Sequence, residues 1–209
     1  MIDEQNYQVL KSSYEKLKID LERDNYFEIT SNALFQEISS KVVHSTDLDE
    51  TVQYLKDILV SDRAEAVSSV GTGRMYRGNF IRFLKDGTTI KMLSQLITLA
   101  KERDLSFRKI KEVDLIEYLN KFSFEVSNRP LAFTHRIYVL LFPDLYTVTI
   151  DRGKLNRIGK QLGIKGADKI HFNNLQFQIR DIVNDFIEKE GLQGESTYIK
   201  MAISEWIFK

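Results

Sequence analysis

The sequence predicts a mainly α fold: a single compact helical domain with at most a short two-stranded β element. Its 209 residues include only two prolines and 10 glycines, which favours long helices over the many turns of a β-sandwich. The hydrophobic residues, 43% of the total, recur at steps of three and four along much of the chain. Since no repeat, low-complexity tract or linker interrupts this pattern, we expect one domain over residues 1–209.

The N-terminal segment predicts a helix with one apolar stripe. The stripe consists of Tyr7, Leu10, Tyr14, Leu17 and Leu21. It could equally form a short coiled-coil seam in an N-terminal helical extension over residues 1–25.

Three further helices are expected before residue 101. One covers Ser31 to Val43, and the next begins near Thr46, where Asp47 and Glu50 suit the positive end of a helix. Residues 68–79 (SSVGTGRMYRGN) predict a loop, because three glycines alternate with Ser and Thr. Asp86-Gly87 predicts a turn before an apolar helical stripe from Leu93 to Ala100.

The second half combines a core helix with the best strand candidate. Residues 131–142 are nearly continuous apolar sequence of helical length, which Pro143 ends. Leu145 to Ile150 is β-branched and aromatic and predicts a strand, with Phe122 to Val126 as its partner. Two closing helices follow, the first capped by Asn173 or Asn174 and ended by Gly191, the second capped by Ser196.

Composition excludes several classes of function. The chain has no cysteine, hence no disulfide, thiolate metal cluster or cysteine nucleophile, and its three histidines are too scattered to predict a zinc site. Without an apolar run of membrane length or an export signal, we expect a cytoplasmic protein with no membrane partner. No metal or other cofactor is expected, because Gly71-Thr72-Gly73-Arg74 completes neither a P-loop nor a dinucleotide fingerprint.

The net charge of zero conceals an uneven distribution. Residues 1–60 carry −6, residues 61–170 carry +8 and residues 171–209 carry −2. A basic centre of this kind indicates an anionic partner, although an ordinary surface whose charges pair across the fold would give the same count. The favoured partner is DNA, and the residues expected to contact its phosphates are Arg74, Arg77, Arg108, Lys109, Arg152, Lys154, Arg157 and Lys160.

Two other patterns suggest chemistry at phosphates. The tail LGIKGADKI resembles the hairpin of a helix-hairpin-helix motif with Lys165 in place of its second glycine, although a plain helix ending at Gly163 explains most of it. Arg129 and His135, five residues apart, resemble the Arg-x4–6-His pattern of HEPN ribonucleases, in which histidine moves a proton and arginine stabilises the phosphorane. The alternative for His135 is a core-edge residue.

Residues 129–164 carry a second resemblance. An apolar helix ending in Phe-Pro-Asp, a short hydrophobic segment and a basic helix ending in Leu-Gly-Ile resemble the N-terminal regions of McrB-like AAA+ restriction proteins. The resemblance implies a DNA-recognition or assembly module of a defence system. With no Walker A motif in this chain, it implies neither motor activity nor GTP binding.

The leading hypothesis is therefore a non-enzymatic module that binds DNA, or a partner within a defence complex, through its basic centre. One alternative is a metal-independent HEPN-like ribonuclease that uses Arg129 and His135. The other is a protein interaction module that buries its apolar helix faces against another chain.

Overall fold

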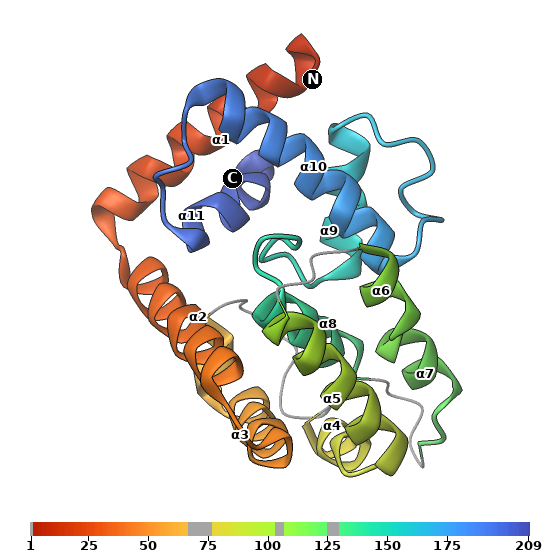
Figure 1. Ribbon diagram of the computed structural model, residues 1–209. Coiled ribbons are helices and arrows are strands. Elements are labelled where there is room, and N and C mark those ends of the chain that lie inside the picture. Colours follow the sequence, from red (N-terminus) through yellow and green to blue (C-terminus); the bar gives the residue numbers. More distant parts are fainter. Residues whose placement is uncertain (1, 67–76, 103–106, 125–129) are drawn as a thin grey trace. The chain divides into compact units, whose positions relative to one another are not determined.

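The computed structural model describes residues 2–66, 77–102, 107–124 and 130–209. Every regular element within these ranges is a helix, which confirms the mainly α fold (Figure 1). The chain divides into two compact units: unit 1 is Met1–Ala33 with Pro143–Lys209, and unit 2 is Leu34–Phe142. Whether they act as one domain stays a prediction. No helix in these ranges is long and apolar enough to cross a membrane.

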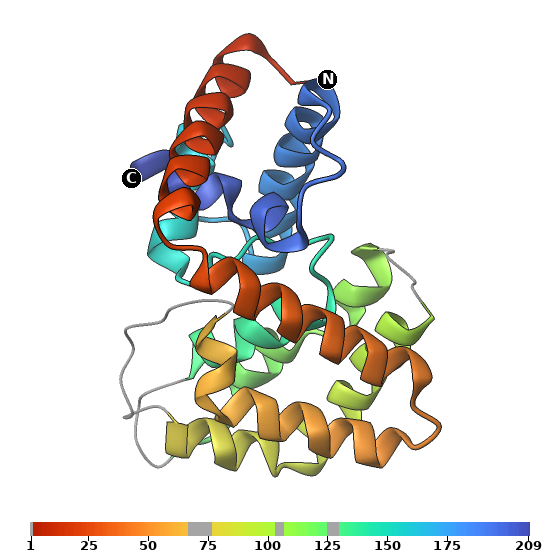
Figure 2. The same ribbon diagram turned by 90° about the vertical axis from the view of Figure 1, so that its left-hand side faces the viewer.

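Unit 1 is built around its N-terminal and C-terminal helices, which Figure 2 shows side by side. Ser13 Oγ donates to the Ile203 carbonyl, and Trp206 Nε1 donates to Asp20 Oδ2 at 2.7 Å. Tyr7 packs on Phe186, with ring centroids 5.8 Å apart. The elements of unit 1 are α1 (Glu4–Arg23), the first turns of α2 (Tyr26–His44), α9 (Arg152–Gln161), α10 (Phe172–Glu190), α11 (Thr197–Ala202) and the 3-10 helix η3 (Ile203–Phe208).

Unit 2 packs a set of mostly short helices around aromatic side chains. Phe80 stacks on Phe133 at 5.2 Å, and Phe83 meets Phe122 edge-on at 5.3 Å. Its elements are the rest of α2, α3 (Leu48–Val60), η1 (Asp62–Ala66), α4 (Arg77–Leu84), α5 (Gly87–Lys101), α6 (Phe107–Glu112), α7 (Leu115–Lys121) and α8 (Leu131–Leu141).

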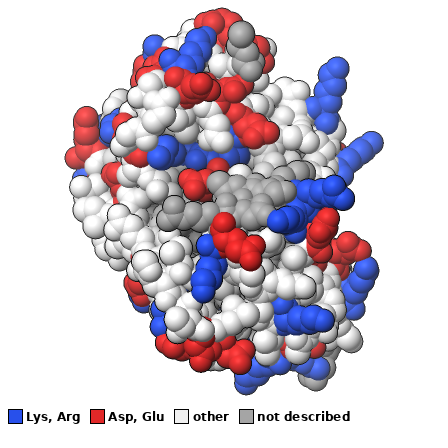
Figure 3. Space-filling model, in the orientation of Figure 1, with Lys and Arg blue, Asp and Glu red and all other residues white. Residues whose placement is uncertain are grey.

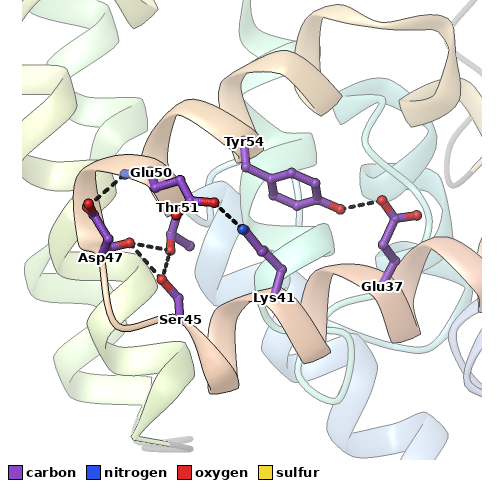
Figure 4. Close-up of polar contacts among 7 residues, drawn as sticks. All are labelled: Glu37, Lys41, Ser45, Asp47, Glu50, Thr51 and Tyr54. Carbon is purple, nitrogen blue, oxygen red and sulfur yellow. Dashed lines mark hydrogen bonds and ion pairs between the residues drawn. The ribbon is translucent and has the colours of Figure 1, made fainter.

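Polar side chains join α2 to α3 along their exposed edge (Figure 4). Tyr54 Oη donates to Glu37 Oε1 at 2.6 Å, and Lys41 forms an ion pair with Glu50. Hydrogen bonds from Arg63 and then from Tyr54 lower the pKa of the Glu37 carboxyl. Because these groups are exposed, they orient the two helices more than they stabilise them.

Local capping signals locate several helix ends correctly. Asp47 Oδ1 accepts from the Glu50 amide at 3.0 Å, and Ser196 caps α11 by accepting from the Ile199 amide. Gly191 ends α10 with φ of +71°, as predicted. Asp86 does more than make a turn, because its carboxylate caps α5 through the Thr89 amide.

Two predicted helix starts are wrong. The second helix begins at Tyr26 rather than Ser31, because Asp24 Oδ1 accepts from the Tyr26 amide at 2.9 Å and starts the helix earlier. α10 begins at Phe172, with His171 rather than Asn173 or Asn174 at the cap position. The predicted loop is described only from Arg77 onward, where α4 already begins, and residues 68–76 lie outside the described ranges.

The predicted strand over Leu145 to Ile150 is wrong. The segment is buried but forms no ladder, and its backbone is bound instead by Gln176 of α10. Gln176 Oε1 accepts from the Thr147 amide at 3.0 Å, and its Nε2 donates to the Thr149 carbonyl at 2.6 Å. Of the expected partner, residues 122–124 form no strand, and residues 125–126 lie outside the described ranges.

Candidate nucleic-acid interface

The basic helix α9 is held by its ends and by one buried face. Asp151 Oδ1 accepts from the Lys154 amide at 2.7 Å at the N-terminus. At the other end the Ile164 amide reaches back to the Gly159 carbonyl at 2.8 Å, and Gly163 has φ of +72°. This pattern is a Schellman cap, in which the predicted Gly163 stops the helix just after its C-cap residue Leu162. Its buried residues are Leu155, Ile158 and Gly159.

Cations follow the opposite side of α9. Lys154, Arg157 and Lys160 recur at steps of three and therefore lie along one side of the helix. Arg157 and Lys160 are exposed, and Lys160 has no hydrogen-bond or ion-pair partner among the residues that the structure describes. Lys154 is half-buried and forms an ion pair with Glu205.

The C-terminal residues add an aromatic ring to this basic stripe. Phe208 is 47% exposed, and the guanidinium carbon of Arg157 lies 5.8 Å from its ring centroid. Lys209 Nζ lies 3.6 Å from the Trp206 ring centroid. The cationic face, as we call it below, consists of Lys154, Arg157, Lys160, Phe208 and Lys209.

Positive charges are close enough on this face to affect one another. Partial burial, and then the neighbouring charge of Lys154, lower the pKa of Lys209, although Glu205 and Asp20 act in the other direction. Glu205 already pairs with Lys154, so the positive charge that faces solvent comes from Arg157, Lys160 and Lys209. Clustered exposed cations of this kind attract anions.

The segment after α9 carries two more exposed cations. Lys165 lies between Gly163 and Gly166, both with positive φ, and Lys169 follows them. Figure 3 shows basic side chains projecting at the edge where Figure 1 places this segment. Elsewhere on the described surface of that face, basic and acidic side chains are interspersed.

Arg152 differs from the other predicted phosphate contacts on α9. Its guanidinium donates to the backbone carbonyls of Ile170 and Ala167, the latter at 3.3 Å. Burial lowers the pKa of Arg152. The side chain thus ties α9 to the segment that precedes α10, a structural role that competes with binding a phosphate.

The remaining predicted contacts belong to unit 2. Arg77 Nη1 lies 3.7 Å from Asp62 Oδ1, and Arg108 Nε lies 3.5 Å from Glu112 Oε1. Lys109 is exposed on α6, and Arg74 lies outside the described residues. Exposed pairs such as these are weak, so they leave Arg77 and Arg108 able to meet an anion.

The division into units also splits the basic centre of the sequence. Residues 71–111 belong to unit 2, and residues 151–169 belong to unit 1. Unit 2 has 16 basic and 14 acidic residues, whereas unit 1 has 14 and 16. Because both units are almost neutral, a local surface such as the cationic face would have to supply the attraction for an anion.

The HEPN alternative depends on Arg129 and His135. His135 lies within α8 and is only 3% exposed. Arg129 lies outside the described residues, so its distance from His135 is not defined. A buried imidazole does not favour direct contact with RNA.

Sequence reasoning missed Phe208 and Lys209. One pattern in the sequence could have indicated Phe208. The apolar stripe of the last helix runs through Ile199, Ile203 and Trp206, and Phe208 lies outside that stripe. An aromatic residue off the apolar stripe and beside a lysine predicts an exposed ring. Its closeness to Arg157, 51 positions earlier, could not be read from spacing.

In the described ranges, no three or more His, Asp and Glu side chains come together as a group that could hold a metal ion. A scan against protein-family models and searches among curated proteins and solved structures find no match to this chain.

Proposed function

We propose that this chain is a non-enzymatic nucleic-acid-binding module that contacts phosphates through the cationic face of unit 1. The observation that carries the proposal is the exposed pair Arg157 and Lys160 on the solvent side of α9, flanked by the half-buried Lys154 and by Lys209. DNA is the favoured ligand.

Three properties of the stripe support this proposal. Its side chains project from a helix fixed at both ends, so the charges are held at a regular spacing. Lys160 has no competing partner among the described residues, and Arg157 contacts a ring rather than a carboxylate. Arginine can bind two phosphate oxygens at once, whereas lysine acts as a point charge.

The proposal is tested by titrating labelled DNA at several salt concentrations. The logarithm of affinity should fall with the logarithm of salt concentration, with a slope of about −0.9 per phosphate contacted in duplex DNA. The double variant Arg157→Glu/Lys160→Glu should weaken binding and make the slope shallower by about 2, one for each lost contact.

A matched control separates a local site from general charge. Lys16→Glu/Lys91→Glu changes the net charge equally at two exposed positions that are not part of the cationic face, on α1 and α5. It should bind nearly as tightly as the unmodified protein. Absence of binding at low salt, or equal weakening by both double variants, would overturn the proposal.

The resemblance of residues 129–164 to McrB-like proteins suggests where such binding would be used. We propose a restriction or other defence system in which this chain recognises DNA, or assembles on it, while other subunits act. Co-purification with a motor or nuclease encoded beside it would support this role, and isolation of the chain alone in the presence of DNA would count against it.

A further inference from the structure

We infer that Phe208 is a stacking platform for an unpaired base, which makes single-stranded nucleic acid the ligand class of the cationic face. This inference rests on the proposed function. It is carried by the exposed Phe208 ring beside Arg157, on a surface that also carries Lys154, Lys160 and Lys209.

The surroundings of Phe208 distinguish it from an ordinary exposed apolar residue. Scattered surface hydrophobics are common and need no explanation. Phe27, for comparison, is 44% exposed in the same unit, but its ring contacts Tyr26, with centroids 5.7 Å apart. Phe208 instead contacts the exposed Arg157, and a cation beside an aromatic ring is the combination that single-strand-binding surfaces use to hold a backbone and stack its bases.

The chemistry of phenylalanine favours a single strand over a duplex. In a duplex the faces of the bases are already stacked on one another, and the grooves present only their hydrogen-bonding edges. Phenylalanine has no hydrogen-bonding group for those edges, and in a duplex its ring is limited to the thymine methyl group or to wedging between base pairs at the cost of unstacking them. Stacking on a base whose face is already free, as in single-stranded DNA or RNA, has no such cost.

Arg157 can serve both parts of the ligand. Its guanidinium lies 5.8 Å from the Phe208 centroid and is exposed, so it can stack on the ring while it donates to a phosphate. Lys209 directly follows Phe208 in the sequence and is exposed as well. A strand that places a base on Phe208 therefore has the Arg157 guanidinium beside that base and able to reach a neighbouring phosphate.

The test compares a fluorescein-labelled oligothymidylate of about 20 nucleotides with a duplex of the same length. We expect the single strand to bind at least about five-fold more tightly, the effect of roughly one stacked base. An oligouridylate tests whether RNA shares the site. Binding should also change the fluorescence of Trp206, the only tryptophan in the chain, which lies two residues from Phe208.

Three variants make the test specific to the ring. Phe208→Leu should weaken single-strand binding about five-fold and leave duplex binding unchanged, whereas Phe208→Tyr should retain it. Phe27→Leu, the matched control, should have no effect. Thermal unfolding checks that each variant remains folded.

The two proposals fail in different ways. If single strand and duplex bind equally and Phe208→Leu changes neither, the inference is wrong, while the proposed function stands as long as Arg157→Glu/Lys160→Glu still weakens both. If neither nucleic acid binds at low salt, the proposed function is wrong, and this inference falls with it.

Discussion

Arg136 of α8 and Arg157 of α9 are the same residue type in consecutive helices, yet their environments are opposite. Each guanidinium lies over a phenylalanine ring, at 5.4 Å from Phe133 for Arg136 and 5.8 Å from Phe208 for Arg157. Arg136 is only 1% exposed, whereas Arg157 is exposed on the surface of unit 1. A count of basic residues therefore does not locate a binding surface, because one arginine is in the core and the other is exposed.

The helices around the two arginines explain the difference. Eight of the 11 residues of α8 are buried, including Thr134 and His135, so its polar groups serve the packing of unit 2. Only three of the 10 residues of α9 are buried, and two of its cations, Arg157 and Lys160, are exposed to solvent where a ligand can meet them. We expect substitutions on α8 to change stability and substitutions on α9 to change binding.

The largest effect is expected for Arg136→Leu. Arg136 is almost fully buried and has interaction partners, and leaving buried polar groups unpaired costs about 1–3 kcal/mol, more when a charged group is involved, so we expect a loss of about 3 kcal/mol. Arg157→Leu, its matched control, should change the free energy of unfolding by less than about 0.5 kcal/mol. Urea unfolding measures both. Equal losses of unfolding free energy in the two variants would contradict the expectation that burial distinguishes these arginines.

The next largest loss of stability is expected when the buried side-chain amide of Gln176 is removed. Gln176→Leu removes the bonds to the Thr147 amide and the Thr149 carbonyl, and leaving those buried groups unpaired costs about 2–3 kcal/mol. Gln178→Leu changes an exposed position of the same helix and should be nearly neutral. If Gln176→Leu unfolds at the same urea concentration as the unmodified protein, the side chain does not hold this segment.

Tyr138→Phe tests a buried hydroxyl in α8 itself. Tyr138 Oη donates to the Val113 carbonyl and accepts from the Leu115 amide, both at 2.9 Å. Its removal should cost about 1–2 kcal/mol, because the ring still fills its space. Tyr26, which is 62% exposed, provides the control Tyr26→Phe. Thermal denaturation distinguishes the two, and identical melting temperatures would contradict the expectation.

Substitution of Asp86 should change the free energy of unfolding least, because this side chain is only half-buried. Desolvation raises its pKa, but hydrogen bonds from the Thr89 amide and the Tyr118 hydroxyl outweigh it, and the pKa is lowered overall. A carboxyl whose pKa is lower in the folded state contributes stability above its unfolded pKa of about 3.9, and loses it as pH falls through the folded value.

Asp86→Asn isolates this contribution. Asparagine caps a helix nearly as well, so the variant should lose less than about 1 kcal/mol at pH 7. Unfolding measured from pH 7 to pH 3 should show the difference between the two proteins shrinking below about pH 4. A difference that stays constant over that range would show that the Asp86 charge is irrelevant to stability.

Sequence periodicity and capping chemistry predicted most of the fold because both act over a few residues. Asp47, Ser196 and Gly191 locate helix ends through bonds within one turn. The strand prediction failed because β-branched residues between Leu145 and Ile150 are also suited to a buried extended segment. The partner of that backbone is Gln176, nearly 30 residues later, which no local pattern reveals.

The candidate site could be predicted only in part for the same reason. The basic stripe of α9 follows from spacing, and its exposed residues, Arg157 and Lys160, were among the predicted contacts. Arg152 belongs to the same helix, but its carbonyl partners come from the turn before α10. Phe208 joins the face through a contact between segments distant in sequence.

Gly159 has a consequence for the direction in which α9 presents its charges. A Cβ at this position would lie 2.9 Å from Leu175 Cδ1 and 3.0 Å from Ala167 Cβ, so a larger residue requires these neighbours, or the helix itself, to shift. A shift of the helix would also displace Arg157 and Lys160, because they belong to the same α9. The absence of a side chain at Gly159 thus lets α9 pack closely against its neighbours and helps to fix where unit 1 presents these charges.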